Sequence, residues 1–243
     1  MNTLATPART TVVGSVRVDF YATIHKALRQ AMSHALGRVG STDFDDEAQR
    51  RITLDAVDGL LGLLRGHLQH ENEFVHAAIE LRRPGAATQT AADHEQHLES
   101  IADLEDESRA LRHARAGQRP LLATRLYRHL ALFIAENLEH MNFEETHNNA
   151  TLWSLFSDAE LIGMHERLVA SIAPDEMAVV IRWMAAGLND AELAGVFGDM
   201  QAKAPPPALE AMLGIARTQL DDTRWARLCR ALGRAPVPGL VRV

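Results

Sequence analysis

The chain has 243 residues, of which 47% are hydrophobic, and its formal net charge is −7. This length can supply a sizeable core for one large domain, or for one domain with an appendage. Basic residues form only short pairs, and no apolar run approaches the roughly 18 residues of a membrane span, so we expect neither nucleic-acid binding nor membrane insertion.

The amino-acid usage favours an all-α fold. Ala, Leu, Glu and Arg are plentiful, aromatic residues make up only 5% of the chain, and runs of β-branched residues are few. The N-terminus lacks the continuous apolar core of a signal peptide. Cys229 is the single cysteine, which excludes an internal disulfide and fits a reducing compartment. We therefore expect a cytoplasmic location.

Four long helices are predicted after an N-terminal arm at residues 1–15. They cover about residues 16–36, 46–81, 87–113 and 120–145. Gly37 and Gly40 are expected to end the first helix, and Gly59 or Gly62 to bend the second. Short connections between helices of similar length imply antiparallel neighbours, so residues 16–150 are predicted to form an antiparallel four-helix bundle.

Shorter helices are predicted in residues 151–243. Capping boxes at residues 157–160 and 189–192 mark two helix starts, and Pro174 suits the first turn of a third helix. Two further helices are expected near 208–220 and 223–232. We interpret this region as a helical appendage that packs on the bundle or on a partner.

The second predicted helix carries two polar residues on its apolar stripe. At about 100° per residue, His67 and Glu71 share a face with Leu60 and Leu64. A buried glutamate is unfavourable unless a cation neutralises it, and neutral imidazole is a common metal ligand.

The other three helices repeat this feature. His25 lies on the stripe of the first helix, and His94 and His97 lie on that of the third. The fourth helix carries His140 and Glu144 with the same spacing of four as His67 and Glu71, which places both side chains on one side of the helix. Two glutamates on facing helices could therefore bridge two cations, each held by imidazoles.

The alternative reading is ordinary core packing. A single buried histidine is usually a hydrogen-bonded core residue, and one His-x3-Glu pair is usually a solvated ion pair. Four helices with ligand types on their inward faces favour a metal site, because without metal these groups would be buried largely unpaired. Further candidates, as ligands or as residues that surround the ligands, are His70, His76, His97, Glu145 and Tyr21.

The segments IHKALR (24–29), HLQHENEFVH (67–76), DHEQH (93–97) and HMNFEE (140–145) resemble the hemerythrin family, also called HHE cation-binding domains. The resemblance covers about residues 16–150. It implies a non-haem centre of two carboxylate-bridged iron ions in an antiparallel bundle. By this resemblance the metal ligands are His25, His67, Glu71, His94, His140 and Glu144, with the two glutamates as bridges.

Two features differ from the oxygen-carrying members of the family. Carriers have two histidines four apart on the third helix, whereas His94 and His97 are three apart. Carriers also place an aspartate five residues after the last histidine, whereas this chain has Glu144 at four and Glu145 at five. The pattern is closer to hemerythrin-like sensors, including the iron-sensing F-box type.

Three hypotheses of function follow. The first is a di-iron protein that binds O2 or a related small ligand, or senses iron or redox state. The second is an oxidoreductase in which the same centre acts on oxygen, peroxide or nitric oxide. The third is an interaction protein in which the metal has only the structural role of holding the helices together. In this protein the C-terminal extension mediates a homo-oligomer or binds a protein partner.

Overall fold

The computed structural model describes residues 17–236, so the predicted arm at residues 1–15 lies outside the described residues. The described chain is all-α, as predicted, and contains no strand between residues 17 and 236. No helix in this range combines the length and the apolar character needed to cross a membrane.

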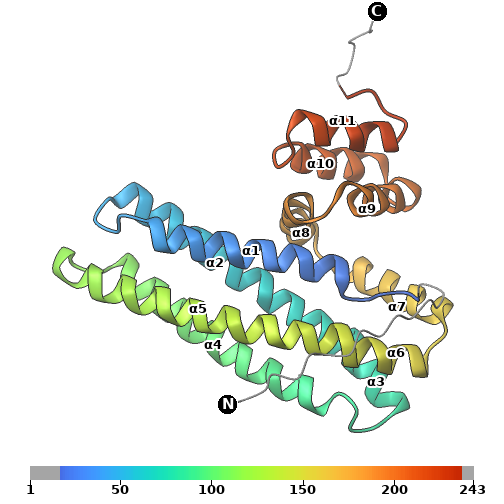
Figure 1. The fold of residues 1–243 in the computed structure, drawn as a ribbon, viewed down its shortest axis with the longest axis horizontal. Helices are drawn as coiled ribbons and strands as arrows, with labels where there is room; N and C mark the ends of the chain where they lie inside the picture. Colours follow the sequence, from blue (N-terminus) through green and yellow to red (C-terminus); the bar gives the residue numbers. More distant parts are fainter. Residues whose placement is uncertain (1–16, 237–243) are drawn as a thin grey trace, which may run out of the picture.

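Four long helices lie side by side in Figure 1: α1 (Ala22–Ser41), α2 (Glu47–His70), α4 (Thr88–Arg112) and α5 (Arg119–Phe143). Helix α1 packs against α2 and α5, and α4 packs against the same two helices. The four helices therefore enclose one core, and we refer to them below as the bundle. Fully buried side chains from all four helices fill this core, among them Leu28, Leu61, Leu104 and Leu130.

The ends of α1 differ from the prediction. The helix begins at Ala22, because the Asp19 carboxylate accepts the backbone N–H groups of Tyr21 and Ala22 and so fixes the first turn. It then continues through both Gly37 and Gly40 to Ser41. Val39 lies in the bundle core, and burial of this side chain favours helix beyond the point where glycine alone would end it.

Two of the long helices continue through a π-helical turn. Helix α2 passes both predicted bend positions, Gly59 and Gly62, as regular α-helix. It leads into the π-helical turn η1 (Glu71–His76) and then α3 (Ala77–Arg82). The fourth predicted helix also differs from the prediction: α5 ends at Phe143, and the helical path continues beyond Glu145 through a second such turn.

This second π-helical turn is η3 (Glu144–Asn148), and α6 (Asn149–Leu155) follows it. A short 3-10 turn, η2 (Ala116–Gln118), connects α4 to α5 at the opposite end of the bundle.

Five shorter helices follow: α7 (Asp158–Ser171), α8 (Pro174–Gly187), α9 (Asp190–Lys203), α10 (Pro206–Arg217) and α11 (Asp222–Ala231). The two predicted capping boxes are confirmed at the starts of α7 and α9, and Pro174 occupies the first turn of α8.

Helix α8 attaches the C-terminal lobe, defined here as α8–α11, to the bundle. Val180 of α8 belongs to the bundle core, whereas Ile181 and Ala185 belong to a separate core that α8 shares with α9, α10 and α11. Figure 1 shows the lobe standing against α1 on one side of the bundle. The lobe is therefore packed on the bundle rather than tethered by a linker.

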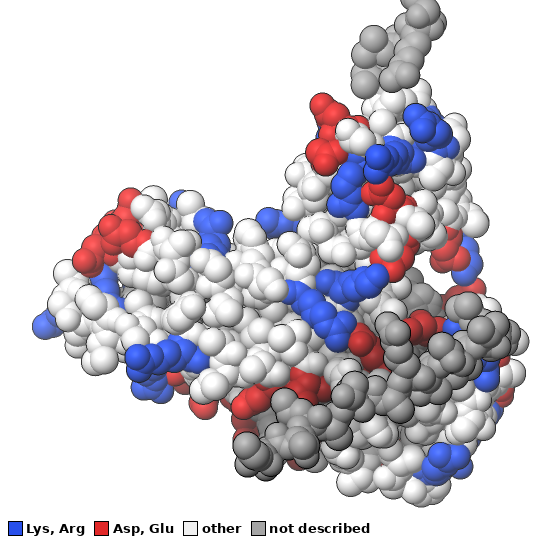
Figure 2. All heavy atoms as spheres, viewed as in Figure 1, with Lys and Arg blue, Asp and Glu red and all other residues white. Residues whose placement is uncertain are grey.

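Polar contacts add to this attachment. Lys26 of α1 forms an ion pair with Glu192 of α9 at 2.5 Å. On the face drawn in Figure 2, basic and acidic side chains are interspersed and lie next to one another where the lobe meets the bundle. Since both partners of the Lys26–Glu192 pair are partly exposed, the pair fixes orientation more than it contributes free energy.

We expect Gly187→Ala to weaken the attachment of the lobe. A Cβ atom at this position would lie 2.9 Å from the backbone oxygen of Lys26, so α8 would have to move away from α1. Overpacking of this kind destabilises by about 1–3 kcal/mol. Gly195→Ala is the matched control, because nothing lies within 4 Å of its added Cβ, and higher helix propensity should stabilise it by up to about 1 kcal/mol. Urea unfolding measures both, and equal effects would contradict the close approach.

Candidate metal centre

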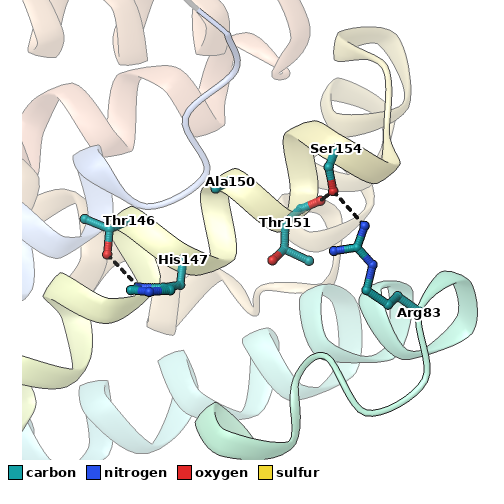
Figure 3. Close-up of a pocket in the computed structure, with 6 residues that line it drawn as sticks. All are labelled: Arg83, Thr146, His147, Ala150, Thr151 and Ser154. Carbon is teal, nitrogen blue, oxygen red and sulfur yellow. Dashed lines mark hydrogen bonds between the residues drawn. The ribbon is translucent and has the colours of Figure 1, made fainter. Parts of the chain in front are cut away.

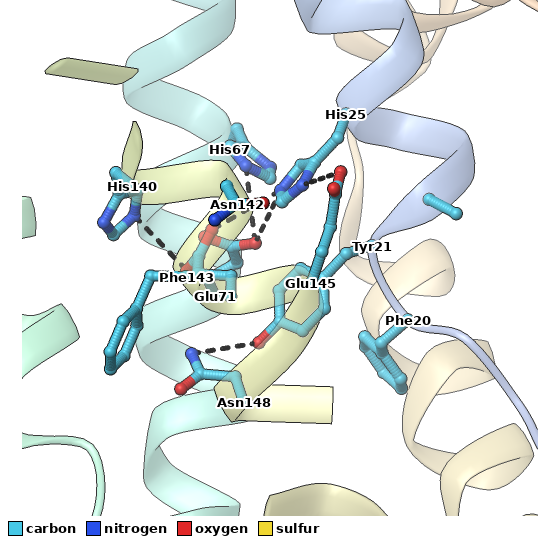
Figure 4. Close-up of polar contacts among 12 residues, drawn as sticks. Phe20, Tyr21, His25, His67, Glu71, His140, Asn142, Phe143, Glu145 and Asn148 are labelled. Carbon is cyan, nitrogen blue, oxygen red and sulfur yellow. Dashed lines mark hydrogen bonds and ion pairs between the residues drawn. The ribbon is translucent and has the colours of Figure 1, made fainter. Parts of the chain in front are cut away.

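Six histidine and glutamate side chains meet inside one end of the bundle. Helix α1 supplies His25, α2 and η1 supply His67 and Glu71, α4 supplies His94, and α5 and η3 supply His140 and Glu144. Five of the six are buried, and His67 is only slightly exposed. Figure 4 shows members of this cluster pointing toward one another from separate helices.

The six side chains form two groups that share both glutamates. The first ligand group contains His25 and His67, the second contains His94 and His140, and Glu71 and Glu144 belong to both. Within each group the candidate ligand atoms all lie within 4.8 Å of one another. Each group therefore offers two imidazole nitrogens and two carboxylate oxygens.

The two oxygens of Glu71 are divided between the groups. Oε1 lies 3.3 Å from His67 Nε2 and 3.8 Å from His25 Nε2, whereas Oε2 lies 3.4 Å from His94 Nε2. One oxygen thus faces each pair of histidines, which is the arrangement of a carboxylate that bridges two cations.

Glu144 is divided in the same way. Its Oε2 lies 3.4 Å from His25 Nε2, and its Oε1 lies 3.3 Å from His140 Nε2 and 3.5 Å from His94 Nε2. Atoms that share one ion at metal–ligand distances of about 2.1 Å are about 3.0–3.4 Å apart, depending on the coordination geometry. The observed separations are close to this range, and the two Nε2 atoms of His94 and His140 are only 3.0 Å apart.

Three of the four histidines are held from behind by an acceptor. The Nδ1 atom of His94 donates to Asn72 Oδ1 at 2.8 Å, that of His25 lies 3.0 Å from Glu145 Oε1, and that of His140 lies 3.4 Å from Asp93 Oδ2. An acceptor at Nδ1 places the proton there and leaves a lone pair on Nε2, which is how metal-bound histidines are usually oriented.

Both shared glutamates open a π-helical turn. Glu71 is the first residue of η1, and Glu144 is the first residue of η3. Such turns are rare and occur often at functional sites, because the extra residue per turn re-aims the side chains beside it. The symmetry of the two ligand groups is therefore also present in the backbone.

The pKa shifts within the cluster show that its buried charges are unfavourable without a cation. Burial opposes a charge on His25, but the carboxylates of Glu144, Glu145 and Glu71 outweigh it and raise the pKa of this imidazole to about 10. Burial and the negative charge of Glu144 raise the pKa of Glu71 to about 8. Burial also acts on Glu144, but contacts with His140, His25 and His94 hold its pKa well below the usual value. In the absence of a cation, protons on His25 and Glu71 thus offset the negative charge of the two glutamates.

The residues fit a pair of divalent ions. His25 Nε2, Glu71 Oε2 and both oxygens of Glu144 are buried and have no hydrogen-bond partner in the described chain. Buried polar atoms of this kind are strongly destabilising unless they are neutralised. Imidazole nitrogens with carboxylate oxygens and no thiolate are donors suited to iron, manganese or zinc.

The other sequence candidates surround the two groups without joining them. His97 and His76 are buried beside the second group, where His97 lies edge-on to His140 and His76 stacks on His94 with ring centroids 4.6 Å apart. Burial lowers the pKa of both imidazoles to about 4, so both are neutral. His70 belongs to neither group and contacts Glu176 of α8 at 3.0 Å.

Glu145 and Tyr21 lie beside the first group. Glu145 contacts Arg29 at 2.5 Å as well as His25, and these contacts lower its pKa to about 2. Tyr21 is buried, its ring lies 5.2 Å from that of His25, and its hydroxyl accepts a hydrogen bond from Asn148. Burial raises the pKa of Tyr21 well above its usual value, so the phenol keeps its proton.

Sequence reasoning missed Asn72 and Asp93, which hold His94 and His140. Both directly adjoin residues of the histidine motifs, Asn72 after Glu71 and Asp93 before His94, and this adjacency was the available signal. Comparison with family models and with curated proteins found no match for this chain.

A surface cavity of about 490 Å³ lies next to η3 and α6, and Figure 3 shows its six lining residues. His147 and Thr146 hydrogen-bond to each other there, and Arg83 donates to Ser154. None of the lining residues belongs to either ligand group, so this cavity is separate from the cluster.

Cation binding should release protons and strengthen as the pH rises. At about pH 7 His25 and Glu71 carry protons in the metal-free protein, since their pKa values of about 10 and about 8 lie above that pH. Both must lose them to act as ligands. Titration calorimetry with Zn2+, in buffers of different ionisation enthalpy, should show more proton release near pH 7 than near pH 9. Affinity that is constant over this range would contradict the protonation states.

Glu145→Ala should weaken metal binding without removing a ligand. Loss of the carboxylate leaves His25 Nδ1 without its acceptor, and losses of this kind reduce metal affinity by about 10- to 100-fold. Glu139→Ala is the control, because Glu139 is exposed on α5. Competition with a chromogenic chelator measures both affinities, and equal affinities would show that Glu145 does not position His25.

Proposed function

We propose that the two ligand groups hold two iron ions bridged by Glu71 and Glu144, and that the chain binds O2 or a related small ligand there, or senses iron or redox state. The observation that carries this proposal is the division of each glutamate between two pairs of histidines. The resemblance of the four histidine segments to the hemerythrin family supports iron as the metal.

His25, His67, Glu71 and Glu144 would hold one ion, and His94, His140, Glu71 and Glu144 the other. Four protein donors are fewer than the six that iron commonly accepts, so bound iron would supply open positions and a reversible change of oxidation state.

The chain's own residues prepare these positions. Glu145, Asn72 and Asp93 orient the histidines from behind, so little reorganisation is needed when a ligand is bound. Fully buried side chains of the bundle, including Leu64, Leu130 and Phe133, limit the access of water. Phe133 lies edge-on to His97 at the second group. A dry, preorganised cluster favours a small neutral ligand over a charged one.

An oxidoreductase acting on oxygen, peroxide or nitric oxide is the second candidate. The observation that favours it is Tyr21, a buried phenol that keeps its proton beside the first ligand group. Such a group could donate a proton to a substrate. Turnover with peroxide or nitric oxide, in the native chain and in a Glu71→Ala variant, distinguishes catalysis from binding.

The purified, iron-loaded protein should contain two metal ions per chain, and Glu144→Ala should lose both, because this residue serves both groups. Metal analysis measures the content, and thermal unfolding should show stabilisation of the native chain by about 2.7 kcal/mol for each bound ion when the free-ion concentration is 100 times the dissociation constant. Mixing the reduced protein with oxygen tests the ligand through the optical spectrum.

His147→Ala serves as the control, since His147 is exposed and lies outside both groups. Metal content that is unaffected by Glu144→Ala would overturn the dinuclear centre. Two bound ions, with neither a reversible adduct nor a redox change, would overturn oxygen binding alone.

A further inference from the structure

A cation that reaches the ligand groups has to enter a closed interior. His25 and Glu144 are 0% exposed and His94 is 1% exposed. The ion must therefore pass other side chains first, and these determine how fast the site fills.

A cavity of about 350 Å³ between α3 and the start of α4 leads toward the second ligand group. Thr88, Ala92 and Glu95 are exposed at its mouth, and Ala87 and His76 are buried at its floor. His76 in turn stacks on His94, a member of the second group. One imidazole thus separates the cavity from a candidate ligand.

His76 has no other visible role in the described chain. It is 5% exposed, and neither of its ring nitrogens has a hydrogen-bond partner. Buried histidines are normally hydrogen-bonded, so an imidazole with both nitrogens free is an exception that needs an explanation. A neutral imidazole that faces a cavity can bind a divalent cation.

The charge of the cavity selects for cations. Among the residues that the structure describes, Glu80 and Glu95 line the cavity, and no lysine or arginine does. Glu80 accepts the backbone N–H groups of Gly85 and Ala87, so its carboxylate is fixed at this place. The larger cavity beside η3 is different, because the cation Arg83 lines it. Acidic walls raise the local concentration of cations and their rate of entry.

We propose that this cavity is the entry port for divalent cations and that His76 is a transient ligand, which passes the ion to the second ligand group. The inference rests on the proposed metal centre. The inference adds to the proposed centre a role for His76, Glu80 and Glu95, none of which belongs to either ligand group.

The test is the rate at which Co2+ loads the metal-free, full-length protein, followed by stopped-flow absorbance. His76→Phe keeps a flat ring against His94 and removes both nitrogens. It should load at least about tenfold more slowly than the native chain, with the same final spectrum and amplitude. His147→Phe is the matched control, because His147 also stacks on a neighbouring ring, that of Phe143, and lines the other cavity. It should load at the native rate.

A second pair of variants does not disturb the interior. Glu95→Gln removes one negative charge at the mouth and should slow loading by about two- to threefold at low salt, an effect that high salt should abolish. Glu99→Gln removes the same charge one turn further along α4, outside the cavity, and should load at the native rate.

Three outcomes would overturn the port. One is loading of His76→Phe and Glu95→Gln at the native rate. Another is a changed final spectrum in His76→Phe, which would make His76 a permanent ligand. In both cases the native chain still binds two ions, so the proposed centre stands. Failure of the native chain to bind Co2+ or iron would overturn the centre together with its port.

Discussion

The structure depends on two carboxylates that are buried together among four imidazoles. Glu71 and Glu144 share one closed space, and neither has solvent to neutralise it. Their candidate ligand atoms lie within 4.8 Å of one another. Two negative charges this close in a dry interior are unfavourable unless cations lie between them. In the metal-free chain, protons on His25 and Glu71 reduce this repulsion. Two bound ions would neutralise both carboxylates and would bind ligands from four helices at once. The same groups would then hold the bundle together.

The periodicity of the sequence was sufficient to predict the helices and to bring the six side chains onto inward faces. Spacings of three and four determine which residues share a face, and that rule depends only on α-helical geometry. It could not predict the π-helical turns at Glu71 and Glu144, because a pattern of spacings of three and four assumes regular α-helix throughout. It likewise misplaced both ends of α1. The Asp19 cap determines where this helix begins, and the burial of Val39 extends it past the two glycines.

The sequence predicted that the C-terminal helices pack on the bundle or on a partner, but it could not predict which residues make the contacts, because these residues lie more than a hundred positions apart. Glu176 of α8 contacts His70, which precedes Glu71, and Glu192 of α9 contacts Lys26, which follows His25. Gly187 allows α8 to approach the backbone of α1 at the same level. The lobe thus touches the immediate chain neighbours of two members of the first ligand group. Residues that adjoin the cluster in the chain therefore also form part of the interface with the lobe.

The two ligand groups are alike in their donors but differ in what surrounds them. The first lies beside an anion and a phenol, because Glu145 and Tyr21 both adjoin His25. The second lies beside two neutral imidazoles, His76 and His97. Both ring nitrogens of His76 and the Nδ1 atom of His97 are buried without a hydrogen-bond partner in the described chain. The charge of Glu145 is balanced by its ion pair with Arg29, but its carboxylate keeps His25 oriented toward the cluster, whereas spare neutral donors make exchange of ligands easier. In the proposed centre, the first position would therefore be the better place to retain an ion and the second the better place to admit one.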